Sequence, residues 1–163
     1  MKSTPEVGAA PKLADLRERA LRLLARREHS RFELTRKLGQ AGFAVEDIAP
    51  LLDEFEQKNW LSDHRFAESY VADHRAKAGS VKLAYELRQR GVSDDIIEAA
   101  LDTQRDSEVE RAREVWRKKF KSAPADATEK ARQVRFLQSR GFTPDIAHSA
   151  IATGTEQVSN LAE

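Results

Sequence analysis

The sequence predicts an all-α protein, built as an elongated tandem array of three three-helix repeats. Apolar residues recur at helical spacing throughout, and no segment shows the alternation that is typical of a strand. The chain also repeats: three segments end alike, and their shared glycines, Gly42, Gly91 and Gly141, lie 49 and 50 residues apart. A period of this length is typical of helical units that stack on one another.

Each shared glycine is expected to end one helix just before the next begins. A leucine stands four residues before each glycine, at Leu38, Leu87 and Leu137. An apolar residue follows each glycine directly, at Phe43, Val92 and Phe142. Glycine suits the left-handed conformation that closes a helix, and the apolar residue can form a hydrophobic staple with the next helix. The expected staple partners are Ile48, Ile97 and Ala147.

A further apolar helical face precedes each of these pairs, which gives nine helices in three triplets. We expect them at about 13–28, 31–41 and 45–58, then at 63–77, 81–90 and 94–104, and finally at 107–121, 127–140 and 144–152. Pro50 falls inside the third helix, lacks an N–H donor, and should kink it. Two capping boxes and several simpler caps mark helix starts: Ser30 with Glu33, Ser107 with Glu110, Ser62, Ser80, Ser93 and Thr143.

These helices divide the chain into five segments. Residues 1–11 contain two prolines and a glycine, and we expect them to form a disordered leader. The three repeats should occupy residues 12–61, 62–105 and 106–152, and residues 153–163 should form a flexible tail. Nothing in this organisation requires more than a monomer.

The composition indicates a cytoplasmic protein that does not contact a membrane. The chain has no cysteine, which excludes disulfides, zinc ribbons and thiol catalysis and suits a reducing compartment. No stretch approaches the roughly 20 apolar residues that a membrane span requires. Lys and Arg number 28 against 27 Asp and Glu, so a net charge of +1 conceals a chain in which 34% of residues are charged.

Catalytic motifs are missing from the sequence. The four histidines are scattered, and there is no HExxH motif, glycine-rich phosphate loop or serine elbow. Acids such as Glu46, Asp47, Asp94 and Asp95 lie in first helical turns, where a favourable interaction with the helix dipole explains them. We therefore expect no enzymatic activity, no cofactor and no metal site.

Positive and negative charges are segregated along the chain. The segment from Lys12 to Lys37 holds nine basic and four acidic residues, whereas that from Val92 to Glu110 holds seven acids and a single base, Arg105. Further basic clusters lie within 75–90 and 111–121. Such clusters suit phosphate backbones or an acidic protein surface, although each could equally be an ordinary solvated face. Most aromatic residues fall on expected core faces, so they do not favour stacking of single-stranded bases.

Specific motifs resemble the RecX regulatory protein family over nearly all of residues 16–151. The residues that are similar to the family's linker and fourth helix are Leu61, Asp63, Arg65, Phe66, Ala67, Tyr70 and Val71. Its central ELxxRG motif is matched by Glu86, Leu87, Arg90 and Gly91. Its C-terminal motif is matched by Arg135, Phe136, Leu137, Arg140, Gly141 and Phe142. Asn59 and Trp60 depart from the family's usual glycine and tyrosine, but asparagine tolerates the left-handed conformation.

The resemblance implies a fold of three tandem three-helix units and a regulatory role. It implies binding in the groove of the RecA–DNA filament and restraint of filament assembly, ATP hydrolysis, strand exchange and coprotease activity, in DNA repair, homologous recombination and the SOS response. Weak binding to single- or double-stranded DNA alone is also implied. We take the basic clusters as the candidate contact residues for RecA and DNA: Arg26, Arg27, Arg31, Arg36, Lys37, Arg75, Lys82, Arg88, Arg90, Arg117, Lys118, Lys119, Arg135 and Arg140.

Two other functions remain open at this point. A helix triplet with a sharp turn before its last helix is similar to a helix-turn-helix module, whose last helix reads bases in the major groove. Here, however, the segments VEDIAPLLDEFEQ and SDDIIEAALD are acidic, and phosphates would repel them. The second alternative is a helical-repeat adaptor for an unrelated protein.

Overall fold

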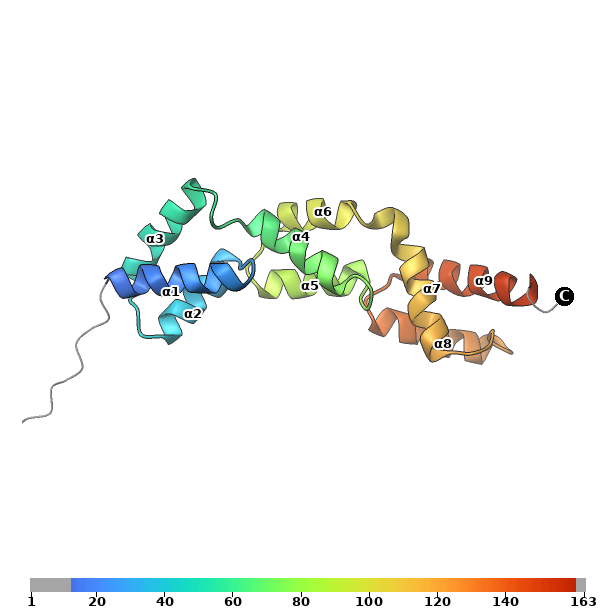
Figure 1. The fold of residues 1–163 in the computed structure, drawn as a ribbon. Helices are drawn as coiled ribbons and strands as arrows, with labels where there is room; N and C mark the ends of the chain where they lie inside the picture. The colour runs from blue at the N-terminus through green and yellow to red at the C-terminus, as the bar shows by residue number, and fades with distance from the viewer. Residues whose placement is uncertain (1–12, 161–163) are drawn as a thin grey trace, which may run out of the picture. The chain divides into compact units, whose positions relative to one another are not determined.

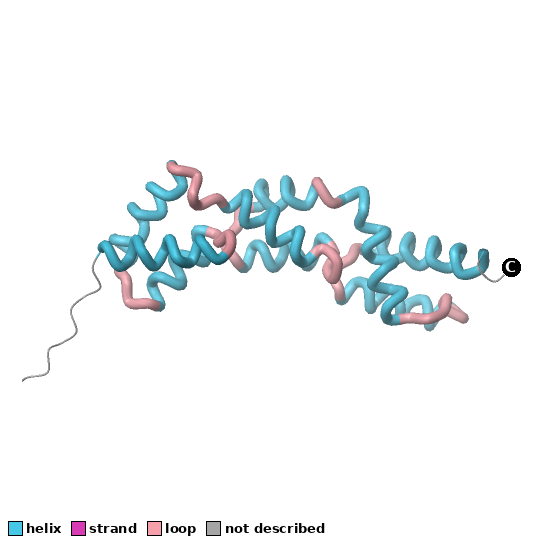
Figure 2. Tube along the Cα trace, viewed as in Figure 1, coloured by secondary structure: helices cyan, strands magenta, loops and turns pink. Residues whose placement is uncertain are grey.

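The regular structure of the described residues is all α-helical, and these residues divide into two units, one that ends at Phe66 and one that begins at Ala67. The structure is a computed structural model that describes residues 13–160. Within these residues nine α-helices and one short 3₁₀ turn are joined by short loops, and no strand is present (Figures 1 and 2). The predicted fold class is confirmed in its helical content and its three triplets.

The first unit contains one complete triplet. Its helices are α1 (Leu13–Arg26), α2 (Arg31–Gln40) and α3 (Val45–Gln57), and α4 (Asp63–His74) begins at its end. The Ser30 hydroxyl accepts a hydrogen bond from the Glu33 N–H at 3.1 Å, and the Glu33 carboxylate accepts one from the Ser30 N–H, so the expected capping box is confirmed. The apolar faces of these helices form one core: Leu16, Ala20, Leu34, Leu38, Ile48, Leu52, Phe55 and Leu61.

The second unit contains the rest of α4 and all the later helices. After α4 come α5 (Ser80–Gln89), α6 (Asp94–Asp102) and the 3₁₀ turn η1 (Arg105–Ser107), then α7 (Glu108–Lys119), α8 (Ala127–Ser139) and α9 (Pro144–Asn160) (Figure 1). In the third triplet the buried Trp116 indole donates a hydrogen bond to the Gln133 side-chain oxygen at 2.7 Å. The apolar side chains of that triplet pack around it: Ala112, Val134, Leu137, Phe142, Ala147, Ala150 and Ile151.

The repeated glycines have the conformation that the sequence predicts. Gly42, Gly91 and Gly141 have positive φ angles of 97°, 72° and 90°. In all three turns the N–H of the residue after the glycine donates to the carbonyl of the leucine that stands five residues before that donor, at 3.2 Å. This bond belongs to the Schellman motif that ends helices. Asn59 likewise has a φ of 59°, as expected for the linker before α4.

Two glycines bring the second and third triplets into backbone contact. The Gly79 N–H donates to the Arg140 carbonyl at 2.9 Å, and the Val81 N–H donates to the Gly141 carbonyl at 3.0 Å. A Cβ atom at Gly79 would lie only 2.4 Å from the Gly141 oxygen, so this approach requires glycine. The second and third triplets are therefore in direct backbone contact within one unit.

Three local expectations are corrected. α9 continues to Asn160, eight residues beyond the expected end at 152, so the segment 153–160 is helical and not a tail. Gly154 lies against Trp116, and this packing fixes the added turns. Ser107 makes no side-chain cap because η1 precedes α7 directly. Ser80 is the first residue of α5 rather than its cap, since its N–H donates to the Glu108 carboxylate.

The remaining expectations concern a kink at Pro50 and the two ends of the chain. α3 includes Pro50 and continues to Gln57. The expected leader, residues 1–11, and the last three residues of the expected tail lie outside the described residues.

Candidate nucleic-acid interface

Four of the fourteen candidate cations are neutralised by carboxylates. Arg27 lies 3.0 Å from Glu33, Arg88 lies 2.7 Å from Asp94, and Arg117 lies 2.8 Å from Glu114. Arg31 is bound by two carboxylates, at 2.7 Å from Asp53 and 3.1 Å from Glu56. A cation that already has a carboxylate partner contributes little net attraction for a phosphate. These four arginines therefore act within the fold.

Arg31 shows this internal role most clearly. Its guanidinium joins the start of α2 to α3 and also donates to the Ala49 carbonyl at 3.3 Å. Burial lowers the pKa of Arg31, but its hydrogen bonds to Asp53 and Glu56 outweigh burial and raise the pKa above its usual value. This arginine stays charged and holds two helices together.

Three further candidates contact neutral groups. The Lys37 ammonium lies 3.0 Å from Nε2 of the buried His29, and Arg75 donates to the Gln104 side-chain oxygen. Arg90 donates to the Glu86 carbonyl at 2.8 Å and lies over the Tyr70 ring, with its guanidinium carbon 4.6 Å from the ring centroid. Each of these side chains is oriented by its own helix or by a neighbouring one.

Seven candidates make no side-chain hydrogen bond or ion pair with any residue that the structure describes. These cations can bind an external anion without first breaking an internal pair. Two of them lie over the ring of Phe136. The Lys119 Nζ atom is 5.9 Å from the ring centroid, and the Arg140 guanidinium carbon is 5.3 Å from it. The seven are Arg26, Arg36, Lys82, Lys118, Lys119, Arg135 and Arg140.

Three of these free cations line one hollow in the second unit, together with a fourth that belongs to a predicted basic cluster but was not among the candidate contact residues. The hollow has a volume of about 280 Å³, and we call it the basic cleft. Its charged lining residues are Lys77, Lys118, Lys119 and Arg140; its apolar ones are Ala76, Val115 and Phe136. No acidic residue lines it. Four positive charges with no carboxylate in the lining create a local field that attracts anions.

The fold holds the four cations in place. Lys77 lies in the turn after α4, and the backbone bonds of Gly79 and Val81 to the end of α8 keep that turn beside Arg140. Lys118 and Lys119 lie in the last turn of α7, where the helix dipole favours positive charge. Phe136 of α8 packs edge-on against Phe120, with ring centroids 5.3 Å apart. The cleft is therefore assembled from three segments that are far apart in the sequence.

Sequence reasoning found part of this cleft and missed part. It named Lys118, Lys119 and Arg140 but left out Lys77, although the basic cluster at 75–90 contained it. It assigned Phe136 to the core, whereas this ring is only half-buried and lines the cleft. Phe32 and Trp60 are also exceptions to the expected aromatic core, because both are exposed.

In the part of the chain that the structure describes, no group of three or more His, Asp or Glu residues could hold a metal ion. No helix among the described residues is long and apolar enough to cross a membrane.

Comparisons with known proteins agree with this architecture. Three family profiles match in order: RecX, first three-helix domain, at residues 17–55, second at 62–101 and third at 106–151. The regulatory protein RecX of Chromobacterium violaceum is 47% identical over 141 residues, covering 86% of this chain and 91% of that protein. The regulatory protein RecX of Halorhodospira halophila is 42% identical, covering 93% and 94%.

A solved structure has the same fold. The crystal structure of RecX from Lactobacillus salivarius superposes with a TM-score of 0.77 at 23% identity, covering 86% of this chain and 95% of that one. Fold and surface together define an all-helical protein of three helix triplets with a cleft lined by basic residues. The chain belongs to the RecX family of regulatory proteins.

Proposed function

We propose that this protein binds the RecA–DNA filament and restrains it, lowering its ATPase, strand-exchange and coprotease activities in the cytoplasm during DNA repair, recombination and the SOS response. Membership in the RecX family supports a role in regulating RecA. The observation that carries the physical mechanism is the basic cleft, whose four cations have no internal carboxylate partner.

In this mechanism the basic cleft holds the DNA backbone of the filament. Each phosphate that a lysine or arginine neutralises releases condensed counterions, which favours binding most at low salt. A phosphate oxygen can accept from the Arg140 guanidinium and from either α7 lysine. Because phosphate contacts carry no base information, the protein would act on filaments of any sequence.

The proposed function does not involve the reading of DNA bases by α3 or α6, the last helices of the first two triplets. The described structure places Asp94, Asp95 and Glu98 of α6 on the surface, and Glu46 and Asp47 of α3 are exposed as well. These acids would repel phosphates if either helix entered a DNA groove. A DNA-binding module of the helix-turn-helix kind is therefore disfavoured as the alternative.

ATP turnover by RecA on single-stranded DNA tests the proposal. The purified protein should lower turnover, and the double variant Lys118→Glu, Lys119→Glu should require at least roughly tenfold more protein for the same effect, since two attractive contacts become repulsive. The matched control is Glu114→Gln with Arg117→Gln, which removes a neutral pair from the same helix. Unchanged turnover with the native protein, or equal loss in both double variants, would contradict the proposed function.

A further inference from the structure

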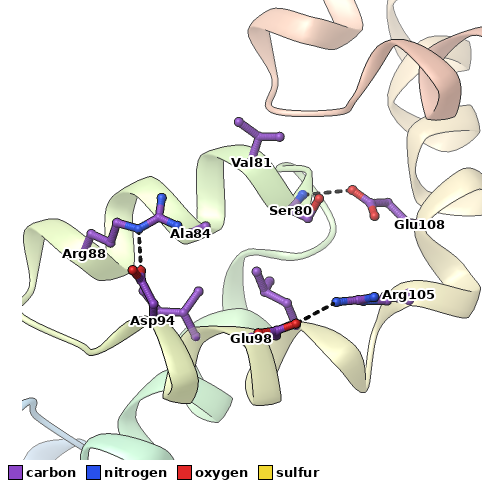
Figure 3. A pocket seen from close by; sticks show the side chains of 10 residues that line it. Ser80, Val81, Ala84, Arg88, Asp94, Glu98, Arg105 and Glu108 are labelled. Atoms are coloured by element: carbon purple, nitrogen blue, oxygen red, sulfur yellow. Dashed lines mark hydrogen bonds and ion pairs between the residues drawn. The ribbon is translucent and has the colours of Figure 1, made fainter.

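A second hollow in the same unit differs in chemistry from the basic cleft. It has a volume of about 600 Å³ and lies between α5 and α6, and we call it the α5–α6 groove (Figure 3). Its apolar lining is formed by Val81 and Ala84 of α5 and by Ile97 and Leu101 of α6. Val81 is 56% exposed, and one turn further along α5 lies Tyr85, which is 60% exposed. Apolar surface that remains open on a folded protein often marks a binding site.

Side-chain contacts brace this groove. The Arg88 guanidinium on α5 lies 2.7 Å from the Asp94 carboxylate on α6. The Ser80 N–H at the start of α5 donates to the Glu108 carboxylate at the start of α7, at 2.9 Å, and Glu108 is only 7% exposed. Figure 3 shows these two bridges at opposite ends of the lining of α5. The walls are therefore fixed before any partner arrives, which reduces the entropy lost on binding.

The length of the groove suits a short peptide segment. The lining residues Val81, Ala84 and Arg88 stand at i, i+3 and i+7 of α5, so they follow one face for about two turns, or roughly 10 Å. Ala84 in the middle has the smallest side chain of the three and leaves room for an inserted apolar residue. A helix of two or three turns fits such a trough.

The charged residues of the groove carry a net negative charge, because three acids line it (Asp94, Glu98 and Glu108) against two arginines (Arg88 and Arg105). Arg88 is paired with Asp94, and Arg105 lies 2.7 Å from Asp102. Glu98 is 3.7 Å from Arg105, and its side chain is 73% exposed. Asp95, next to Asp94 in α6, lies outside the lining and has no ion-pair partner within the described residues. An acidic edge beside an apolar floor attracts a basic amphipathic segment and repels a phosphate backbone.

We infer that the α5–α6 groove binds a basic, amphipathic segment of a protein partner. This inference rests on the proposed function, under which the partner is the protein component of the RecA–DNA filament. The two hollows then divide the filament between them: the basic cleft takes the DNA backbone, and the α5–α6 groove takes the recombinase. Tyr85 at the margin belongs to a residue type that often dominates the binding energy of protein interfaces.

Two variants test the groove, one by filling it and one by reversing its charge. Ala84→Trp places a large ring in the trough, and Glu98→Lys removes the excess negative charge of the groove lining while leaving the Arg105–Asp102 pair intact. The control is Glu156→Lys, the same charge change at an exposed position of α9 outside the groove. Thermal unfolding is measured for all three, so that Glu98→Lys still decides the outcome if Ala84→Trp does not fold.

The readouts are affinity for RecA assembled on single-stranded DNA and affinity for the same DNA without RecA. Both groove variants should bind the filament at least roughly tenfold more weakly, with affinity for naked DNA unchanged or, for Glu98→Lys, slightly increased. Glu156→Lys should behave like the native protein in both measurements.

Failure of this inference differs from failure of the proposed function. If the native protein binds the filament and both groove variants bind it equally well, the groove inference is wrong and the proposed function stands. Weaker binding of folded groove variants to naked DNA would make the groove a nucleic-acid site and overturn the inference. If the native protein does not bind the filament at all, the proposed function fails first, and the groove inference with it.

Discussion

Lys118 and Arg117 are neighbours on α7 and carry the same charge, yet their surroundings differ. Arg117 is neutralised by Glu114 at 2.8 Å, whereas Lys118 has no described partner and faces the basic cleft. Side-chain positions decide which cations have carboxylate partners. A count of charges along the sequence does not contain this information. Sequence reasoning could therefore name both residues but could not separate them.

His29 shows how burial sets a protonation state. Its Nδ1 lies 3.0 Å from the Arg27 carbonyl and its Nε2 lies 3.0 Å from the Lys37 ammonium. This arrangement suits a neutral ring that donates through Nδ1 and accepts from Lys37 through Nε2. Burial lowers the pKa of His29, a hydrogen bond to the Arg27 carbonyl partly offsets this, and the charges of Arg27 and Lys37 lower the pKa further.

The lowered pKa of His29 predicts a loss of stability in mild acid. Since the unfolded ring titrates near 6.5, the unfolded chain binds more protons than the folded chain as the pH falls below that value. The contribution of His29 to the free energy of unfolding should be complete above about pH 7. It should decline as the pH drops toward the pKa of the folded state. Urea unfolding at several pH values between roughly 5.5 and 7.5 measures this decline.

Two substitutions assign the pH effect to His29. His29→Gln should have a flatter dependence on pH than the native protein because the titrating group is gone. The control His148→Gln changes an exposed histidine of α9 and should keep the native slope. A native slope in His29→Gln would show that another group is responsible.

The close contact between the start of α5 and the end of α8 joins neighbouring triplets. Glycine at 79 and 141 permits backbone bonds of 2.9 and 3.0 Å, and these bonds place Lys77 beside Arg140. Gly141 was predicted from its turn, which is a local feature. The need for Gly79 could not be predicted, because it depends on a residue 62 positions further along the chain.

Gly79→Ala should destabilise the second unit. Its Cβ would lie 2.4 Å from the Gly141 oxygen, and both partners are backbone, so one segment must move. Overpacking of this kind typically costs about 1–3 kcal/mol. Urea unfolding should show the loss, and affinity for DNA should fall with it because the basic cleft opens.

A second glycine provides the contrast for this substitution. Nothing lies within 4 Å of a Cβ at Gly39, a helical position near the end of α2. Gly39→Ala should therefore stabilise the protein by up to about 1 kcal/mol through helix propensity. Equal effects of the two substitutions would show that the contact between Gly79 and Gly141 does not constrain the fold.

Across the whole chain, local signals predicted the helices and long-range contacts decided the site. Helix ends followed from glycines and caps, and eight of the nine helices end within three residues of their predicted ends. α9 is the exception because its added turns depend on Gly154 packing against Trp116. The basic cleft draws on α7, α8 and the turn after α4, so no single run of sequence could reveal it.

Charge segregation predicts a salt dependence that a net charge of +1 would not suggest. If all four cations of the basic cleft neutralise phosphates, the logarithm of affinity for single-stranded DNA should fall with the logarithm of salt concentration with a slope near −3, since each contact contributes about −0.7. Removing two contacts by Lys118→Gln and Lys119→Gln should make the slope shallower by about 1.4. Replacing both Glu114 and Arg117 by glutamine should leave it unchanged, because that pair is already neutral. Fluorescence anisotropy of a labelled oligonucleotide over a range of salt concentrations measures all three slopes. A shallow slope for the native protein, or the same slope in every variant, would show that DNA is bound elsewhere on the molecule.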